Sequence, residues 1–205
     1  MYNSLQLLYN GNMTTTAAQR VKEAMKVGRV YRTKELRPFS NNLARDLEKL
    51  VENKELVRAA PGLYYKPQMT RVGAFPASPE ELVRAFLGED EFLLTSLDDY
   101  NPLGLGLTQL YNETIVYNRK RHGRLTLDGR KFSFRRPKDF PRNLSKEFLY
   151  VEALNNKKEL LEDTSQLEKL LLQRTKGMDL KALLVAATRY GKVSTKKFFE
   201  EIVSL

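Results

Sequence analysis

The stretch at residues 40–66 reads SNNLARDLEKLVENKELVRAAPGLYYK and contains the clearest structural pattern of the chain. Its first half spaces apolar residues at i, i+4, i+7 and i+8, which predicts a helix over 41–53 with one apolar face. Those apolar residues are Leu43, Leu47, Leu50 and Val51. Its second half holds two short strand-like runs on either side of Pro61-Gly62, the residue pair that a type II turn favours. The stretch therefore predicts a helix followed by a two-stranded hairpin.

The residues before this stretch predict two further helices. Residues 17–27 place apolar side chains on one helical face and end at Gly28, a suitable helix stop. Val30-Tyr31 is a short extended piece, and Thr33 can cap a one-turn helix over 34–37 that ends at Pro38. The element order is then helix, short strand, short helix, longer helix and hairpin.

This order is typical of a winged helix-turn-helix, which we predict for residues 16–70 after a lead-in segment, 1–15. In such a domain the second helix of the turn enters the DNA major groove, where Asn pairs with adenine and Arg with guanine. Residues at the preceding helix N-terminus and in the wing would contact phosphate or the minor groove. The predicted DNA-binding residues are Thr33, Lys34, Ser40, Asn41, Asn42, Arg45, Lys49, Arg58, Tyr64 and Lys66.

Two acidic residues leave a second interpretation open. Glu48 and Glu52 lie on the exposed face of the predicted helix and would repel phosphate. A helical subdomain with a polar face can also bind another protein. A protein-binding module that neutralises or docks a partner without DNA is therefore the alternative function.

Residues 71–205 predict a mixed domain, so that the whole chain is of the α+β class. Ser78 and Glu81 form a capping box before a helix through about Leu87. Strand-like runs are expected to form a small antiparallel sheet, with Asp128-Gly129 as a hairpin turn. These runs are residues 92–95, 114–118, 124–127 and 131–135. C-terminal helices are predicted near 146–156, 165–174, 179–189 and 195–204.

Composition excludes several chemistries. The 205 residues include 35 Lys and Arg against 25 Asp and Glu, one His and no Cys. Without Cys there is no thiolate nucleophile, Cys-bound zinc or disulfide, and His122 alone cannot build a multi-His metal site. We therefore expect no enzyme activity, no cofactor and no metal. The net charge of +10 is uneven: residues 20–71 carry +7, residues 72–109 carry −6 and residues 110–147 carry +7.

The last of these segments contains the second basic block, on turns and alternate strand positions. It could contact phosphate, dock an acidic partner, or simply protect a solvated hairpin edge from aggregation. The block consists of Arg119, Lys120, Arg121, Arg124, Arg130, Lys131, Arg135 and Arg136.

The acidic segment gives a further alternative, a metal-dependent nuclease. Such an enzyme needs carboxylates held together in a cavity, usually with a Lys, and no Lys occurs in residues 72–109. The interpretation we favour is a solvated acidic loop. The carboxylates concerned are Glu89, Asp90, Glu91, Asp98 and Asp99.

The sequence also predicts a cytoplasmic location. No run approaches the roughly 18 apolar residues of a membrane helix, and the longest candidate, 183–187, is flanked by Lys181 and Arg189. The N-terminus lacks the basic and apolar regions of a signal peptide, and Met13 is an alternative start to Met1.

Several short motifs in this order resemble those of AbiEi-type antitoxins of bacterial type IV toxin–antitoxin systems. Three segments are similar to that family's N-terminal domain: the entry 28–31, the helix 40–50 and the wing 56–65. Within the wing, residues 58–64 run from a basic residue through two small residues to Gly, an aliphatic residue and Tyr. Asn101-Pro102-Leu103-Gly104-Leu105 with Thr108-Gln109 looks like its Asn-x-Leu-Gly-Leu segment, and residues 115–136 match its small β-rich middle.

The resemblance covers most of the chain and is weaker in the C-terminal helices. It implies a DNA-binding repressor that binds operator repeats in its own operon and counteracts a nucleotidyltransferase-like toxin. A solitary relative without a toxin neighbour would keep only the regulatory role.

Overall fold

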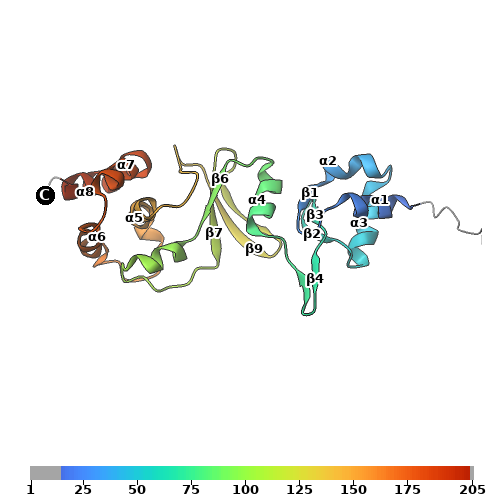
Figure 1. Cartoon of the computed structure of the whole chain (residues 1–205), viewed down its shortest axis with the longest axis horizontal. Coiled ribbons are helices and arrows are strands. Elements are labelled where there is room, and N and C mark those ends of the chain that lie inside the picture. The colour runs from blue at the N-terminus through green and yellow to red at the C-terminus, as the bar shows by residue number, and fades with distance from the viewer. Residues whose placement is uncertain (1–14, 204–205) are drawn as a thin grey trace, which may run out of the picture. The chain divides into compact units, whose positions relative to one another are not determined.

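The computed structural model describes residues 15–203, so the lead-in predicted for residues 1–15 lies almost wholly outside the described part. The chain divides into two compact units between Phe86 and Leu87, here called unit 1 and unit 2. Both combine helices with small sheets, which confirms the α+β class (Figure 1). No helix within residues 15–203 is long and apolar enough to cross a membrane.

Unit 1 begins with helices that close around one apolar cluster. These elements are α1 (Ala17–Ala24), β1 (Val30–Arg32), α2 (Thr33–Leu36), the 3-10 helix η1 (Arg37–Phe39) and α3 (Leu43–Glu52). The helical periodicity of the sequence places Val21, Leu36, Leu47 and Leu50 in the interior, where α1 packs against α3. The helix predicted at 41–53 is therefore present, two residues shorter at its start.

The chain then forms an antiparallel sheet of order β1-β3-β2, from β2 (Val57–Ala60) and β3 (Leu63–Tyr65). The predicted turn lies between these strands, and Gly62 has a φ of +79°, a conformation that glycine adopts without strain. Because β3 lies in the middle, Tyr64 pairs with Arg58 on one side and with Tyr31 on the other.

Two elements that follow belong with this unit. They are the hairpin of β4 (Gln68–Thr70) and β5 (Gly73–Phe75), which the sequence did not predict, and the helix α4 (Pro79–Leu87). The guanidinium of Arg32 donates to the carbonyl oxygens of Ala85 (2.5 Å) and Phe86 (2.8 Å) at the end of α4. The structure thus divides after residue 86, whereas the sequence pattern placed the boundary at 70/71.

Unit 2 contains a four-stranded sheet of order β6-β7-β9-β8. Its strands are β6 (Phe92–Thr95), β7 (Glu113–Asn118), β8 (Gly123–Leu127) and β9 (Arg130–Arg135). The prediction of an antiparallel sheet is wrong at one pairing, because β7 and β9 run parallel. Neighbouring runs in the sequence suggested a hairpin from β7 to β8, but the segment 119–122 crosses the end of β9 and leaves β9 between them.

One buried side chain holds this crossover in place. The amide nitrogen of Asn118 donates to the carbonyl oxygens of Arg121 (3.0 Å) and Arg135 (3.2 Å). Its amide oxygen accepts from the backbone nitrogens of Lys120 (2.9 Å) and Arg121 (2.6 Å). Asn118 is fully buried, so these bonds replace the water that the crossover backbone would otherwise need.

The predicted turn between β8 and β9 is confirmed. Leu127 pairs with Arg130, and both turn residues have positive φ, +49° at Asp128 and +74° at Gly129. Positive φ at both positions is the geometry of a type I′ hairpin, which the Asp-Gly pair favours.

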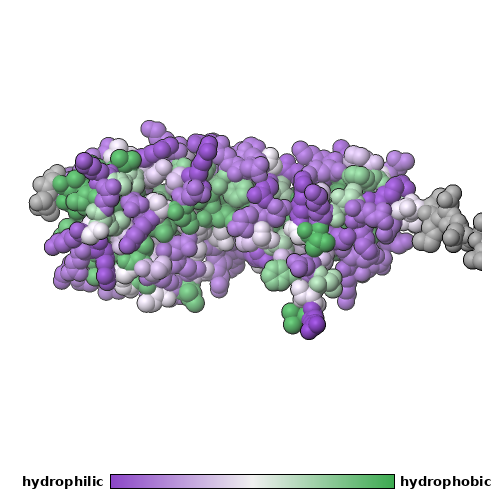
Figure 2. All heavy atoms as spheres, in the orientation of Figure 1, coloured by the Kyte–Doolittle hydropathy of each residue, from purple (hydrophilic) through white to green (hydrophobic). Residues whose placement is uncertain are grey.

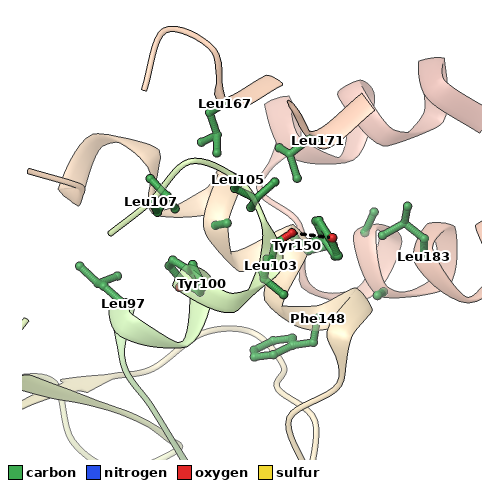
Figure 3. Packing of buried hydrophobic residues seen from close by; sticks show 14 of the residues in the cluster. Leu97, Tyr100, Leu103, Leu105, Leu107, Phe148, Tyr150, Leu167, Leu171 and Leu183 are labelled. Carbon is green, nitrogen blue, oxygen red and sulfur yellow. Dashed lines mark hydrogen bonds between the residues drawn. The ribbon is translucent and has the colours of Figure 1, made fainter. Parts of the chain in front are cut away.

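Helices pack beside this sheet in the same unit (Figure 1). They are the 3-10 helix η2 (Leu97–Leu103), α5 (Lys146–Asn155), the 3-10 helix η3 (Lys157–Glu159), α6 (Leu167–Thr175), α7 (Leu180–Tyr190) and α8 (Val193–Val203). Three leucines of the segment 101–109, Leu103, Leu105 and Leu107, lie in their core, and the Tyr150 hydroxyl donates to the carbonyl of Leu103 at 3.1 Å (Figure 3). Gly104 has a φ of +71°, and a Cβ there would lie 2.9 Å from Nε of Arg174.

Candidate nucleic-acid interface

The start of α3 is fixed by Ser40, one of the predicted DNA-binding residues. Its hydroxyl donates to a carboxylate oxygen of Asp46 (2.6 Å) and accepts from the backbone nitrogen of Asn42 (3.0 Å). Ser40 is itself buried. It therefore positions the turn before α3 and is not exposed to a ligand.

Four predicted residues remain exposed at this helix. Asn41 and Asn42 lie in the turn before it, and Arg45 and Lys49 lie one turn apart on its solvent face. Neither cation forms an ion pair with any residue from 15 to 203. Because Leu43 and the other apolar residues hold the opposite face in the core, these polar side chains point to solvent.

The two glutamates on this helix, Glu48 and Glu52, are exposed as well. They lie one turn apart, and Glu48 is three residues from Arg45. The face is thus of mixed charge, with two carboxylates among its two cations. Any phosphate bound there experiences both attraction and repulsion.

At the start of α2, most groups that could hold phosphate are already used. Both the backbone nitrogen and the hydroxyl of Thr33 donate to the carbonyl of Gly62, at 2.9 and 3.2 Å. The backbone nitrogen of Arg32 donates to Glu35 at 2.8 Å. Lys34 is exposed and is the one predicted contact here whose side chain is available within the described residues.

The three wing residues differ in exposure. Arg58 is exposed on β2, whereas Tyr64 is half-buried and packs against the helical cluster. Lys66 is half-buried too, and its carbonyl accepts from the backbone nitrogen of Gly28 at 2.9 Å. Arg58 is therefore the wing side chain best placed to meet a ligand.

In unit 2, much of the second basic block is paired with carboxylates. Arg119 donates to Glu91 (2.8 Å) and Asp139 (3.5 Å). Lys120 pairs with Glu89 at 2.7 Å. The acidic segment that separates the two basic blocks in the sequence thus neutralises part of the second block.

The remaining members of the block fall into two groups. Arg124 pairs with Glu113 (3.0 Å), and Arg135 with Glu159 (2.6 Å). Arg121, Arg130, Lys131 and Arg136 lie at least partly in solvent. Four of the eight members of the block, Arg119, Lys120, Arg124 and Arg135, are thus held in ion pairs.

Two of the carboxylates considered for a nuclease, Asp98 and Asp99, form local hydrogen bonds. Asp99 accepts from the Thr95 hydroxyl (2.8 Å) and the backbone nitrogen of Ser96 (2.7 Å) at the start of η2. Asp98 accepts from the backbone nitrogen of Tyr111 at 2.6 Å. Within residues 15–203, no three His, Asp or Glu side chains come together in a way that could hold a metal ion.

Three cations that the sequence pattern did not single out lie near the second basic block. Lys138, Arg189 and Lys192 line a cleft together with Arg135 and Arg136. Arg189 donates to Asp139 at 2.5 Å, and this bond holds the pKa of the Asp139 carboxyl below its usual value. No sequence signal points to this group, because β9 and α7 are more than 40 residues apart in the chain.

Comparisons with protein-family models, curated proteins and solved structures found no match for this chain.

Proposed function

We propose that unit 1 is a winged helix-turn-helix that binds double-stranded DNA sequence-specifically, with α3 as its recognition helix. The main support for the proposal is the exposed set of Asn41, Asn42, Arg45 and Lys49, whose two cations form no ion pair among residues 15–203. Two of these are amides suited to adenine, one is a guanidinium suited to guanine, and one is an ammonium suited to phosphate.

The order of elements supports the same proposal. The strand β1 is followed by the one-turn helix α2, a tight connection through η1 and the longer α3. The strands β2 and β3 come next and form an antiparallel sheet with β1, in the order β1-β3-β2. In winged helix-turn-helix domains this order sets the second helix of the turn in the major groove, with the hairpin beside it. Arg58, exposed on that hairpin, is the proposed wing contact.

A transcriptional regulator is the role that we propose for this binding. The motif resemblance extends the proposal to an antitoxin that represses its own operon and counteracts a nucleotidyltransferase-like toxin. A neighbouring toxin gene whose growth inhibition is relieved by co-expression of this chain would support the antitoxin role. Unrelieved inhibition at matched expression would reject it and leave the regulatory role.

The DNA proposal is tested by selecting duplexes from a random library and measuring affinity for the selected and for random DNA. We expect Arg45→Ala to reduce the preference for selected DNA by about 1–3 kcal/mol, the usual cost of a lost base contact. Lys26→Ala is the matched control, because Lys26 is an exposed cation that follows α1 and does not belong to α3. An unchanged ratio of affinities in Arg45→Ala would reject the assignment.

One observation favours protein binding as the second candidate function. The hairpin of β4 and β5 exposes Met69, Val72 and Phe75, by 69%, 98% and 61% (Figure 2). Exposed apolar side chains gathered on one hairpin are typical of protein-binding surfaces. If the chain captures a partner after charge reversal at Arg45 and Lys49, and binds no DNA in a salt-sensitive way, this second function is the correct one.

A further inference from the structure

A cleft in unit 2 lies outside the proposed DNA interface. It has a volume of about 1030 Å³ and is formed by the end of β9, the loop after it, the C-terminal part of α5 and the end of α7. We call it the β9–α7 cleft. Ligand pockets commonly measure about 300–1,000 Å³, so this cleft can admit a molecule the size of a nucleotide.

The floor of the cleft is a buried polar network. Glu152 is only 6% exposed, and one of its carboxylate oxygens accepts a hydrogen bond from the Tyr117 hydroxyl. Its oxygens also accept from the side-chain nitrogens of Asn155 (2.6 Å) and Asn156 (3.1 Å). Because these polar groups are hydrogen-bonded to one another, the floor of the cleft has a fixed shape.

Arg135 extends the network from β9 toward solvent. Its guanidinium donates to the side-chain oxygen of Asn156 (3.0 Å) and pairs with Glu159 (2.6 Å), and its side chain is 17% exposed. This cation is therefore held at one position and partly desolvated. Electrostatic interactions are stronger in such an environment than in open water.

The walls carry an excess of positive charge. Six Lys and Arg side chains line the cleft against three carboxylates. The six are Arg124, Arg135, Arg136, Lys138, Arg189 and Lys192, and the three are Asp139, Glu152 and Glu159. Arg136 and Lys138 are exposed and form no ion pair with any described residue, so their charges face the ligand space uncompensated.

We propose that the β9–α7 cleft binds a nucleotide through its phosphate groups, with Arg136 and Lys138 as the main anion contacts. A phosphate carries more charge and more acceptor oxygens than a carboxylate and suits a cluster of Lys and Arg. The ring of Tyr190, which is partly exposed on the wall of the cleft, adds a surface on which a base can stack. An acidic peptide would use the cations and leave this ring unused.

The test uses the full chain carrying Arg45→Ala and Lys49→Ala, so that α3 does not contribute to nucleotide or strand binding. Inorganic phosphate, the four nucleoside triphosphates and a single-stranded decamer are titrated separately by calorimetry. We expect at least one nucleoside triphosphate to bind and to raise the melting temperature with concentration, as ligand linkage requires. If the decamer binds more tightly than the triphosphates and the triphosphates compete with it, the phosphate that the cleft binds belongs to a nucleic-acid strand and not to a free nucleotide.

The cleft variant is Arg136→Ala with Lys138→Ala, and its control is Arg130→Ala with Lys131→Ala, two cations of the same sheet outside the cleft. We expect the cleft variant to lower nucleotide affinity at least tenfold while the control stays within twofold of the parent. Equal losses in both variants, or no binding of any probe at millimolar concentration, would overturn the proposal. So would binding of poly-glutamate that the nucleoside triphosphates do not displace.

Discussion

The solvent face of α3 and the second basic block are both rich in Lys and Arg, but their cations have different partners. On α3, Arg45 and Lys49 have no carboxylate within ion-pair distance among residues 15–203. In the second basic block, Arg119 and Lys120 pair with Glu91 and Glu89 from the acidic segment. The number of Lys and Arg residues in a segment of sequence therefore does not predict how many of those cations are free to bind a ligand.

The cause of the difference lies in topology. The helix α3 packs on its unit through its apolar face, and the carboxylates near its two cations, its own glutamates and Glu55, form no ion pair with them. The crossover from β7 to β8 lies beside the segment before β6, and this segment is acidic. We therefore expect that removing cations from α3 weakens ligand binding, whereas removing cations from the crossover between β7 and β8 lowers protein stability.

The largest expected effect is on DNA affinity. Arg45→Ala with Lys49→Ala removes one base contact and one phosphate contact, and we expect at least about tenfold weaker binding to selected DNA. Arg119→Ala with Lys120→Ala removes the same charge from the second basic block and should change this affinity less than twofold. Fluorescence anisotropy at one fixed salt concentration measures both. Equal losses of affinity in the two double variants would show that the cations of α3 and of the second basic block do not differ in DNA binding.

The next effect is on the stability of unit 2. Asn118→Ala leaves the backbone groups of the crossover without their buried partner, and we expect a loss of about 1–3 kcal/mol in the free energy of unfolding. Asn112→Ala is the control, since Asn112 is exposed in the same unit. Urea unfolding followed by circular dichroism gives both values. A loss at Asn118 no larger than that at Asn112 would show that the crossover does not depend on this side chain.

A smaller effect concerns pH. The hydrogen bond from Arg189 lowers the pKa of Asp139 below 3.8, so folding favours the ionised carboxylate. Its contribution to stability is present above about pH 4 and is lost as the pH falls through the lower, folded-state pKa. Asp139→Asn should therefore melt below the parent at pH 7, and the gap should narrow as the pH falls through the lowered pKa of the Asp139 carboxyl. A gap that stays constant from pH 7 to pH 2 would contradict the pairing.

The smallest effect tests the repulsion on α3. Glu48→Gln removes one carboxylate beside Arg45, so affinity for any duplex should rise slightly, by less than about fivefold, without a change in sequence preference. Glu23→Gln on α1 removes an equally exposed carboxylate and is expected to have no effect. Lower affinity after Glu48→Gln would mean that this residue makes a favourable contact.

Regular local patterns predicted most of the elements. The apolar spacing of Leu43, Leu47 and Leu50 gave α3, and Asp128-Gly129 gave the hairpin of β8 and β9. These features depend on neighbouring residues, and helical and hairpin geometry follow from such short-range preferences.

Strand pairings and contacts between residues far apart in the chain could not be predicted from such local patterns. The parallel pairing of β7 with β9 depends on Asn118 and a four-residue crossover that looks like an ordinary turn in the sequence. The candidate site shows the same limit. Ser40 was predicted to contact DNA from the start of a helix, but its side chain is buried and its hydroxyl donates to Asp46. The β9–α7 cleft brings Lys192 next to Asn155, 37 residues away, and no local pattern reports such a contact.

The most direct test of the central claim is a map of backbone amide shifts in the ¹⁵N-labelled chain on addition of a selected DNA duplex. We predict the largest changes at Asn41, Asn42 and along α3, with smaller changes at Arg58 on the hairpin. Changes concentrated on residues 119–136, with α3 unaffected, would contradict it.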